Sequence, residues 1–108
     1  VGELEDIEIR DRAKLAQAGI ITVFSVLDRN TGEIVTHPEL AQRGFIGEDE
    51  RNLLDRAADA ARQALEELSS EARRDTGEVE EAVRLAVRRF FRKRIDRKPV
   101  VIPIIYEA

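Results

Sequence analysis

Few residues of this 108-residue chain have the chemistry of an active site, and they do not form a catalytic pattern. His37 is the only histidine, and the chain contains no cysteine. A hydrolytic zinc site takes about three protein ligands, drawn from histidine, carboxylate or cysteine. None of the serines lies in a Gly-x-Ser-x-Gly turn, and the segment 44–47 does not match a phosphate-binding glycine loop. We therefore predict no catalytic residue, metal ligand or cofactor in this chain, and a structural or exposed role for His37.

Positive charge is the one chemical feature that the sequence concentrates. Seven of the eleven residues from 88 to 98 are basic: Arg88, Arg89, Arg92, Lys93, Arg94, Arg97 and Lys98. Such a cluster can contact RNA phosphates, and the candidate contacts are Arg88, Arg89, Arg92, Lys93 and Arg94. The alternative is structural, because cations favour the C-terminal end of a helix and basic residues beside an apolar strand limit aggregation. A second, smaller basic group consists of Arg10, Arg12 and Lys14.

The net charge of −4 argues against a chain that attracts nucleic acid over its whole surface. No stretch is long and apolar enough to predict a membrane span. Because the sequence starts at Val1 and has no methionine, we expect it to be a piece of a longer protein or a chain given without its tag.

The element around which the fold is organised is the nearly apolar run from Lys98 to Ala108. Its Val, Ile and Tyr residues favour a strand buried within a sheet, with Pro99 opening the strand and Pro103 at an edge or a bulge. Residues 20–27 are the only other stretch able to pair with it. Both faces of that strand carry large apolar side chains, as in strands that are central or covered on both faces.

A turn and a short strand are predicted to follow the first strand. Residues 28–32 form the turn, and residues 33–36 return antiparallel to the first strand. Residues 37–41 are predicted as one helical turn with Pro38 in its first position, and residues 43–47 as extended chain.

Two helices with apolar stripes complete the pattern, one over residues 48–72 and one ending near Ile95. Asp75 and Glu78 have the spacing of a capping box at the start of the second helix. The order β-β-α-α-β predicts an α+β fold, a small three-stranded sheet with two antiparallel helices packed on one face. We assign residues 1–19 to a linker and residues 20–108 to the domain.

The predicted layers leave one face of the sheet without helices, although its strands are apolar on both faces. Because exposed apolar faces commonly mark interfaces, we expect a homodimer in which two sheets pack face to face. The candidate interface residues are Ile21, Val23, Ile102, Ile104 and Tyr106. The opposite faces of the same strands are an equal alternative, and the linker is a competing cover for this surface.

Four segments carry a resemblance to a known family. They are the Ile-Arg-Asp-Arg run at residues 9–12 with Leu15, residues 19–23, the Arg-Gly-Phe-Ile run at residues 43–46, and the closing run at residues 97–105. Together they resemble the C-terminal part of bacterial ribonuclease J. The resemblance extends over the whole chain, although the helices match in pattern only.

The resemblance implies a cytoplasmic bacterial parent enzyme of RNA processing and decay. Such enzymes have a metallo-β-lactamase fold, 5′-to-3′ exonuclease and endonuclease activities and a two-zinc site in the catalytic part. The histidine and aspartate motifs of that site are absent here, so no catalytic residue carries over. For this chain, the resemblance implies a non-catalytic C-terminal domain that supports oligomerisation and full activity. Its partners would be a second copy, the catalytic core of the same polypeptide and, through the parent enzyme, RNA. The alternatives are an RNA-binding module that guides substrate through the basic clusters, and an independent enzyme.

Overall fold

A computed structural model of the chain describes residues 19–47, 51–95 and 98–108. The elements are β1 (Ile20–Leu27), β2 (Ile34–Arg43), α2 (Arg51–Glu67), the 3₁₀ turn η2 (Ala72–Arg74), α3 (Thr76–Ile95) and β3 (Val100–Glu107). This is the predicted β-β-α-α-β order of an α+β fold. The segment 1–18 of the predicted linker, with the basic residues Arg10, Arg12 and Lys14, lies outside the described residues, and so does Arg97.

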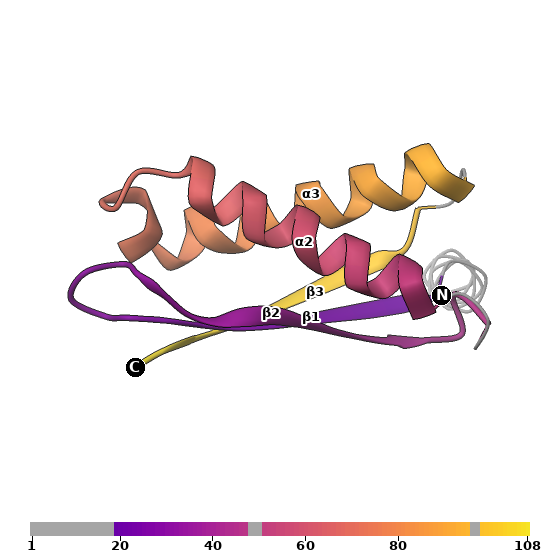
Figure 1. The fold of residues 1–108 in the computed structure, drawn as a ribbon, viewed down its shortest axis with the longest axis horizontal. Helices are drawn as coiled ribbons and strands as arrows, with labels where there is room; N and C mark the ends of the chain where they lie inside the picture. Colours follow the sequence, from indigo (N-terminus) through magenta and orange to yellow (C-terminus); the bar gives the residue numbers. More distant parts are fainter. Residues whose placement is uncertain (1–18, 48–50, 96–97) are drawn as a thin grey trace, which may run out of the picture.

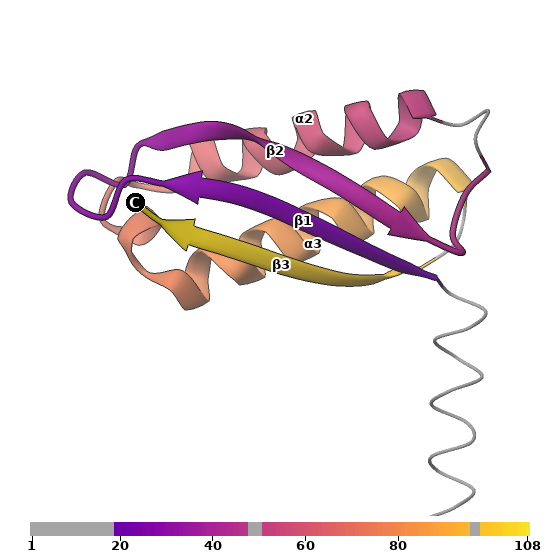
Figure 2. The ribbon, with the colours of Figure 1, turned by 90° about the horizontal axis from the view of Figure 1, so that it is seen from below.

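The molecule has two layers, with both helices on one face of a three-stranded sheet (Figure 1). The strand order is β2-β1-β3, and β1 pairs with β2 antiparallel and with β3 parallel. Parallel neighbours need a long crossover connection, which here contains β2 and the two helices. Seen from below, the sheet lies in front of the helices, and none of the described elements covers its outer face (Figure 2).

The pairing of the first and last strands is confirmed, but β3 is an edge strand rather than a strand within the sheet. The central strand is β1, which pairs along its whole length with β3, from Ile20 opposite Val100 to Leu27 opposite Glu107. An edge strand tolerates proline because one side of its backbone needs no ladder hydrogen bond. This position accounts for Pro103, which lies within β3 opposite Val23.

The core lies between the sheet and the helices. Residues four positions apart bring one row of side chains from each helix onto the sheet. The row of α3, together with the central strand, supplies most of the fully buried side chains: Val79, Val83, Val87 and Phe91 from α3, and Ile21, Val23 and Leu27 from β1. From α2 come Ala57, Ala61 and Leu65, whose small members let that helix approach closely.

Phe45 closes the core at the end of β2. Its ring meets the ring of Phe91 edge to face, with 4.9 Å between the centroids. The Gln42 side chain fixes this segment, because its Oε1 accepts hydrogen bonds from the backbone N–H of Phe45 and of Ile46, each at 3.0 Å. Residues 44–46 therefore form a bend rather than a further strand.

The prediction for residues 37–41 was wrong, because they continue β2 instead of forming a helical turn. Two register irregularities let the strand accommodate its extra residues, one between the partners of Phe24 and Val26 and one between those of Val26 and Leu27. Pro38 is buried but lies in an edge strand, where its missing N–H is tolerated. Bulges of this kind interrupt the alternation that would have identified a ten-residue strand from the sequence.

The helix connections agree with the prediction in part. The first helix ends at Glu67, several residues before the predicted end, and residues 48–50 of its predicted start are outside the described part. Asp75 Oδ1 accepts the N–H of Glu78 at 3.3 Å, which is one half of the predicted capping box. In the other half of a capping box, the Glu78 side chain would accept a hydrogen bond from the Asp75 N–H. Here that N–H donates to the carbonyl of Ala72 instead.

Candidate interaction surfaces

The only histidine is paired with a single carboxylate. His37 Nε2 lies 3.3 Å from Asp59 Oδ1, and both side chains are largely exposed. Within residues 19–47, 51–95 and 98–108, no group of three or more histidine, cysteine or acidic side chains is placed to hold a metal ion. The described residues therefore do not supply the set of about three ligands that a hydrolytic zinc site takes.

The first candidate surface is the outer sheet face, defined as Ile20, Thr22, Phe24 and Val26 of β1 with Val100, Ile102, Ile104 and Tyr106 of β3. The parallel register places these residues opposite one another in pairs, so they share one side of the sheet. Four of them are large and well exposed: Phe24 by 41%, Ile102 by 43%, Ile104 by 47% and Tyr106 by 61%. A contiguous apolar surface of this kind typically marks an interface.

The structure divides the predicted interface set between the two faces of the sheet. Ile102, Ile104 and Tyr106 lie on the outer sheet face, but Ile21 and Val23 are fully buried beneath the helices. The correction follows from the register, which pairs Ile102 with Thr22 and not with Ile21. Because side chains alternate along a strand, a difference of one residue in register transfers a strand's residues to the other face.

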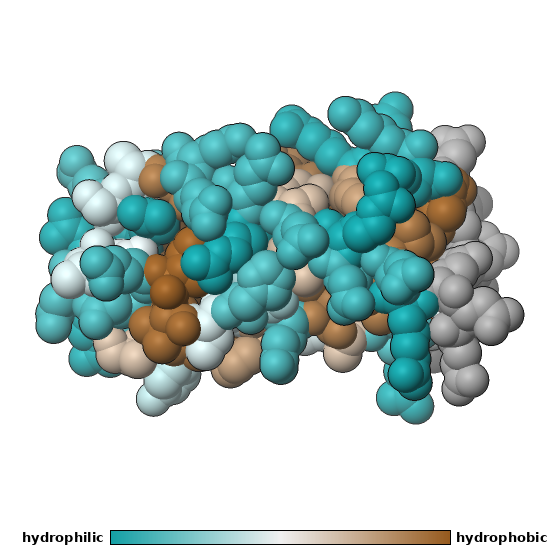
Figure 3. All heavy atoms as spheres, in the orientation of Figure 1, coloured by the Kyte–Doolittle hydropathy of each residue, from teal (hydrophilic) through white to brown (hydrophobic). Residues whose placement is uncertain are grey.

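Polar residues adjoin the outer sheet face on the side of β2. Glu39 pairs with Phe24, and Arg43 pairs with Ile20. The surface therefore has an apolar centre over β1 and β3, and an apolar centre with a polar margin is the common anatomy of protein interfaces. The margin along β2 is mixed, since this strand also carries Ala41, which pairs with Thr22, and the exposed Val35. By contrast, hydrophilic side chains cover most of the side of the molecule in Figure 3, and the hydrophobic residues there form smaller groups.

The second candidate surface is basic, and the structure separates the predicted cluster into two groups. Arg88, Arg89 and Arg92 of α3 meet Lys98, which precedes β3, around a cavity of about 200 Å³ that also includes Leu85. We call these four basic residues the α3 basic site. Lys98 was noted in the basic run but not among the five candidate contacts, because the sequence does not show that the chain returns there.

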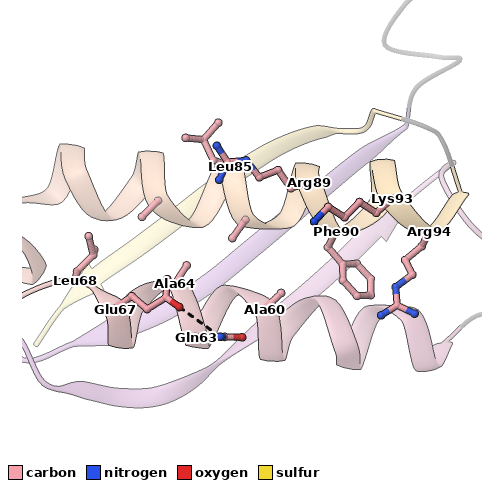
Figure 4. Close-up of a pocket in the computed structure, with 12 residues that line it drawn as sticks. Ala60, Gln63, Ala64, Glu67, Leu68, Leu85, Arg89, Phe90, Lys93 and Arg94 are labelled. Atoms are coloured by element: carbon pink, nitrogen blue, oxygen red, sulfur yellow. Dashed lines mark hydrogen bonds between the residues drawn. The ribbon is translucent and has the colours of Figure 1, made fainter.

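The other two basic residues, Lys93 and Arg94, line a groove between α2 and α3, and Arg89 belongs to the lining of both hollows (Figure 4). The Arg94 guanidinium lies over the Phe90 ring, 5.3 Å from its centroid, and in Figure 4 both side chains point from α3 toward α2. Leu85 points the opposite way. Phe90 also meets Phe91 edge to face, so neither ring offers a free face beside the α3 basic site.

The groove has a volume of about 590 Å³ and was not predicted as a site. Four small residues form much of its lining: Ala60, Ala64, Ala82 and Ala86. At one wall the Gln63 side-chain amide donates to Glu67 Oε1 at 3.4 Å, a pair one helical turn apart on α2.

Neither α2 nor α3 is long and apolar enough to cross a membrane, and the described residues include no other such helix.

Comparison with known proteins places this architecture in a family. The family model of the ribonuclease J C-terminal domain matches residues 7–108. Ribonuclease J2 of Bacillus subtilis is 32% identical over 109 aligned residues, which cover the whole of this chain and 20% of the relative. Ribonuclease J 2 of Staphylococcus epidermidis is also 32% identical, over 99% of this chain and 19% of its own length.

A more distant relative is ribonuclease J of Corynebacterium glutamicum, which is 24% identical over 97% of this chain and 14% of its own length. The chain thus spans a fifth or less of each of these relatives. Because the family model covers both paired strands and both helices, this chain belongs to the ribonuclease J C-terminal domain family.

Proposed function

We propose that this chain is the non-catalytic C-terminal domain of a ribonuclease J-like enzyme, and that it assembles the enzyme through its outer sheet face. In this proposal, RNA is cut in another part of the polypeptide, in the bacterial cytoplasm, by exonuclease and endonuclease activities that use zinc. Support comes from the family match and from the coverage, since the relatives named ribonuclease J are at least five times as long as the matched region.

The observation that carries the assembly role is the exposure of Phe24, Ile102, Ile104 and Tyr106 on one side of the sheet. Exposed single apolar residues are ordinary, but four large ones on adjacent strands form a continuous patch. Burying a large aliphatic side chain stabilises by roughly 1.5–3 kcal/mol when the burial is complete. In a two-fold dimer each of these side chains would be buried once in each copy, so every such burial would stabilise the dimer twice.

A second copy of this chain is the proposed occupant. A two-fold arrangement joins the same surface of both molecules, so it closes without leaving a further apolar patch exposed. The alternative occupants are the linker and the catalytic core of the same polypeptide. Both predict that this chain is a monomer. The linker would cover the outer sheet face within the chain itself, whereas the catalytic core would leave that face exposed when the chain is studied alone.

Sedimentation velocity over a concentration series tests the assembly role. We expect the chain to dimerise and Ile104→Lys to be a folded monomer, because a charge would be buried in the interface without a partner. Asn30→Lys is the matched control, because Asn30 is exposed in the turn between β1 and β2 and lies outside the sheet. A chain that stays monomeric at several hundred micromolar contradicts the proposal, as does a dimer that Ile104→Lys leaves intact.

The absence of catalysis is tested separately. The purified chain is incubated with 5′-monophosphorylated labelled RNA and zinc, magnesium or manganese. We expect no cleavage, because the described residues give His37 only one carboxylate neighbour and no further zinc ligand. Cleavage that copurifies with the chain through successive columns would contradict the proposal.

A further inference from the structure

We propose that the α3 basic site, Arg88, Arg89, Arg92 and Lys98, binds the phosphate backbone of single-stranded RNA without reading its bases. The inference rests on the proposed function, which makes RNA the polyanion that this domain meets. It assigns a binding role to four named residues that the assembly role does not use.

The geometry brings the four cations together from two parts of the chain. Arg88 and Arg92 lie one turn apart on α3, about 6 Å along the helix axis, and Arg89 adjoins them. Lys98 follows the end of α3 and returns to the same cavity of about 200 Å³. A water molecule occupies about 30 Å³ of liquid, so the cavity has room for a phosphate group.

No carboxylate among the described residues forms an ion pair with these four side chains. Two other arginines of the helix layer have such partners. Arg62 on α2 is paired with Glu66, and Arg84 on α3 is paired with Glu81. Like charges that lie close together repel, so a cluster whose described surroundings give it no ion-pair partner favours an external polyanion.

Stabilisation of the helix end does not account for the cluster. Cations interact with the helix dipole within the last turn only, and Arg92, Lys93 and Arg94 are the basic residues of that turn. Arg88 and Arg89 precede the last turn, and Lys98 lies beyond the helix. The helix dipole therefore leaves three of the four residues unexplained. A charge beside the apolar strand β3 would account for Lys98 but not for Arg88 and Arg89.

The side-chain chemistry favours phosphate over the bases. Guanidinium groups donate two parallel hydrogen bonds to phosphate oxygens, and three of the four residues are arginine. Sequence-tolerant binding of bases requires exposed aromatic faces, but Phe90 and Phe91 contact each other and Phe90 also lies under Arg94. The expected binding is therefore independent of sequence and strongly dependent on salt.

Fluorescence anisotropy with a labelled mixed-sequence RNA of about a dozen nucleotides, within the footprint range of known single-strand binders, tests the inference. The measurements run from low to moderate salt. We expect Arg88→Gln/Arg92→Gln to weaken binding at least tenfold at low salt. The plot of log affinity against log salt should become shallower by about 1.4, since the variant loses two phosphate contacts and each contributes about 0.7 to the slope for a single strand.

The matched control is Arg62→Gln/Arg84→Gln, which removes the same amount of charge from arginines that already have carboxylate partners. We expect it to lose clearly less affinity than the site variant, because Glu81 and Glu66 already compensate these two charges, although Arg84 lies one turn before Arg88 on α3. Equal losses in the two double variants would overturn the inference, and so would an unchanged chain that does not bind. Tighter binding of an acidic polyglutamate peptide than of RNA would also overturn it, since an acidic protein would then be the partner.

Sedimentation of the same variants distinguishes failure of this inference from failure of the proposed function. The α3 basic site lies on the helix layer, on the opposite side of the sheet from the outer sheet face (Figures 1 and 2). Arg88→Gln/Arg92→Gln should therefore leave the dimer unchanged. A dimer that does not bind RNA would overturn this inference alone, whereas a monomer that binds RNA through these residues would overturn only the assembly role.

Discussion

At the scale of single residues, Asp28 organises the turn between β1 and β2. Its Oδ1 accepts the backbone N–H groups of Asn30 and Thr31, each at 2.8 Å. These hydrogen bonds hold the pKa of the Asp28 carboxyl below its ordinary value of 3.8, and the bond from the Thr31 N–H has the larger effect. The ionised form therefore favours the folded chain.

Replacing Asp28 with Asn should remove this dependence on pH. A carboxyl with a lowered folded pKa contributes stability above its unfolded pKa and loses it as pH falls through the folded value. The unchanged chain should thus exceed Asp28→Asn in unfolding free energy at neutral pH, and the difference should shrink below about pH 4. Urea unfolding between acidic and neutral pH measures it. A difference that stays constant with pH would contradict the assignment.

Gly32 is needed for both its conformation and its small size. Its φ is +76°, and a Cβ at this position would lie 2.7 Å from the backbone oxygen of Ser70. We expect Gly32→Ala to destabilise the domain by about 1–3 kcal/mol, because it adds left-handed backbone strain to a steric clash.

Gly47→Ala is the control for this substitution, since a Cβ there meets no atom within 4 Å. Thermal unfolding of both variants provides the comparison. Equal stability of Gly32→Ala and Gly47→Ala would show that the turn moves away from the connection between α2 and α3.

At the scale of elements, the sequence predicted those parts whose apolar pattern is uninterrupted. Strand β1 has its predicted bounds, and α3 ends at Ile95 as predicted, with its buried face formed by residues four apart. Strand β2 was predicted too short, because Pro38 and two bulges conceal its alternation. The choice of sheet face could not be predicted, since β1 and β3 both carry large apolar residues on both sides.

The sequence predicted that basic residues gather towards the end of α3, but it did not predict which of them form the α3 basic site. The sequence shows a basic run, and helical periodicity alone places Arg88 and Arg92 on the same side of α3. It does not show that Lys98 joins them or that Lys93 and Arg94 line the groove instead. Those placements depend on how the chain crosses from α3 to β3 and on how α2 packs beside α3.

Removing β3 by deleting residues 99–108 should unfold the domain. The deletion takes away the parallel partner of β1 and the buried side chain of Val101, and it leaves a two-stranded hairpin beneath the helices. Two-stranded hairpins are only marginally stable in water. We expect the loss of the cooperative thermal transition in circular dichroism.

A chain that lacks residues 1–18 is the control for this truncation. The assignment of residues 20–108 as the domain predicts that this shorter chain keeps its cooperative transition. If the β3 deletion also kept one, together with dispersed amide signals in NMR spectra, β3 would be peripheral to the fold.

At the scale of the whole molecule, the two layers separate the two proposed activities. Self-association uses the outer sheet face, and RNA binding uses the helix layer behind it. A sheet-to-sheet dimer would therefore leave both copies of the α3 basic site exposed, one on each outward side. A strand long enough to reach both would bind through two linked contacts, and linkage of this kind raises affinity without any new contact.

The dimer should consequently bind long RNA more tightly than short RNA. For a strand several times longer than a single site of about 4–16 nucleotides, we expect an affinity gain of at least tenfold, at the low end for bivalent binding. Ile104→Lys should lose this gain while binding short RNA as well as Asn30→Lys does, since both variants add the same charge but only the first changes the outer sheet face. Anisotropy with RNAs of increasing length measures the effect. An affinity that rises equally with length in both variants would mean that the two sites do not act together, because additional phosphates alone would then explain the increase.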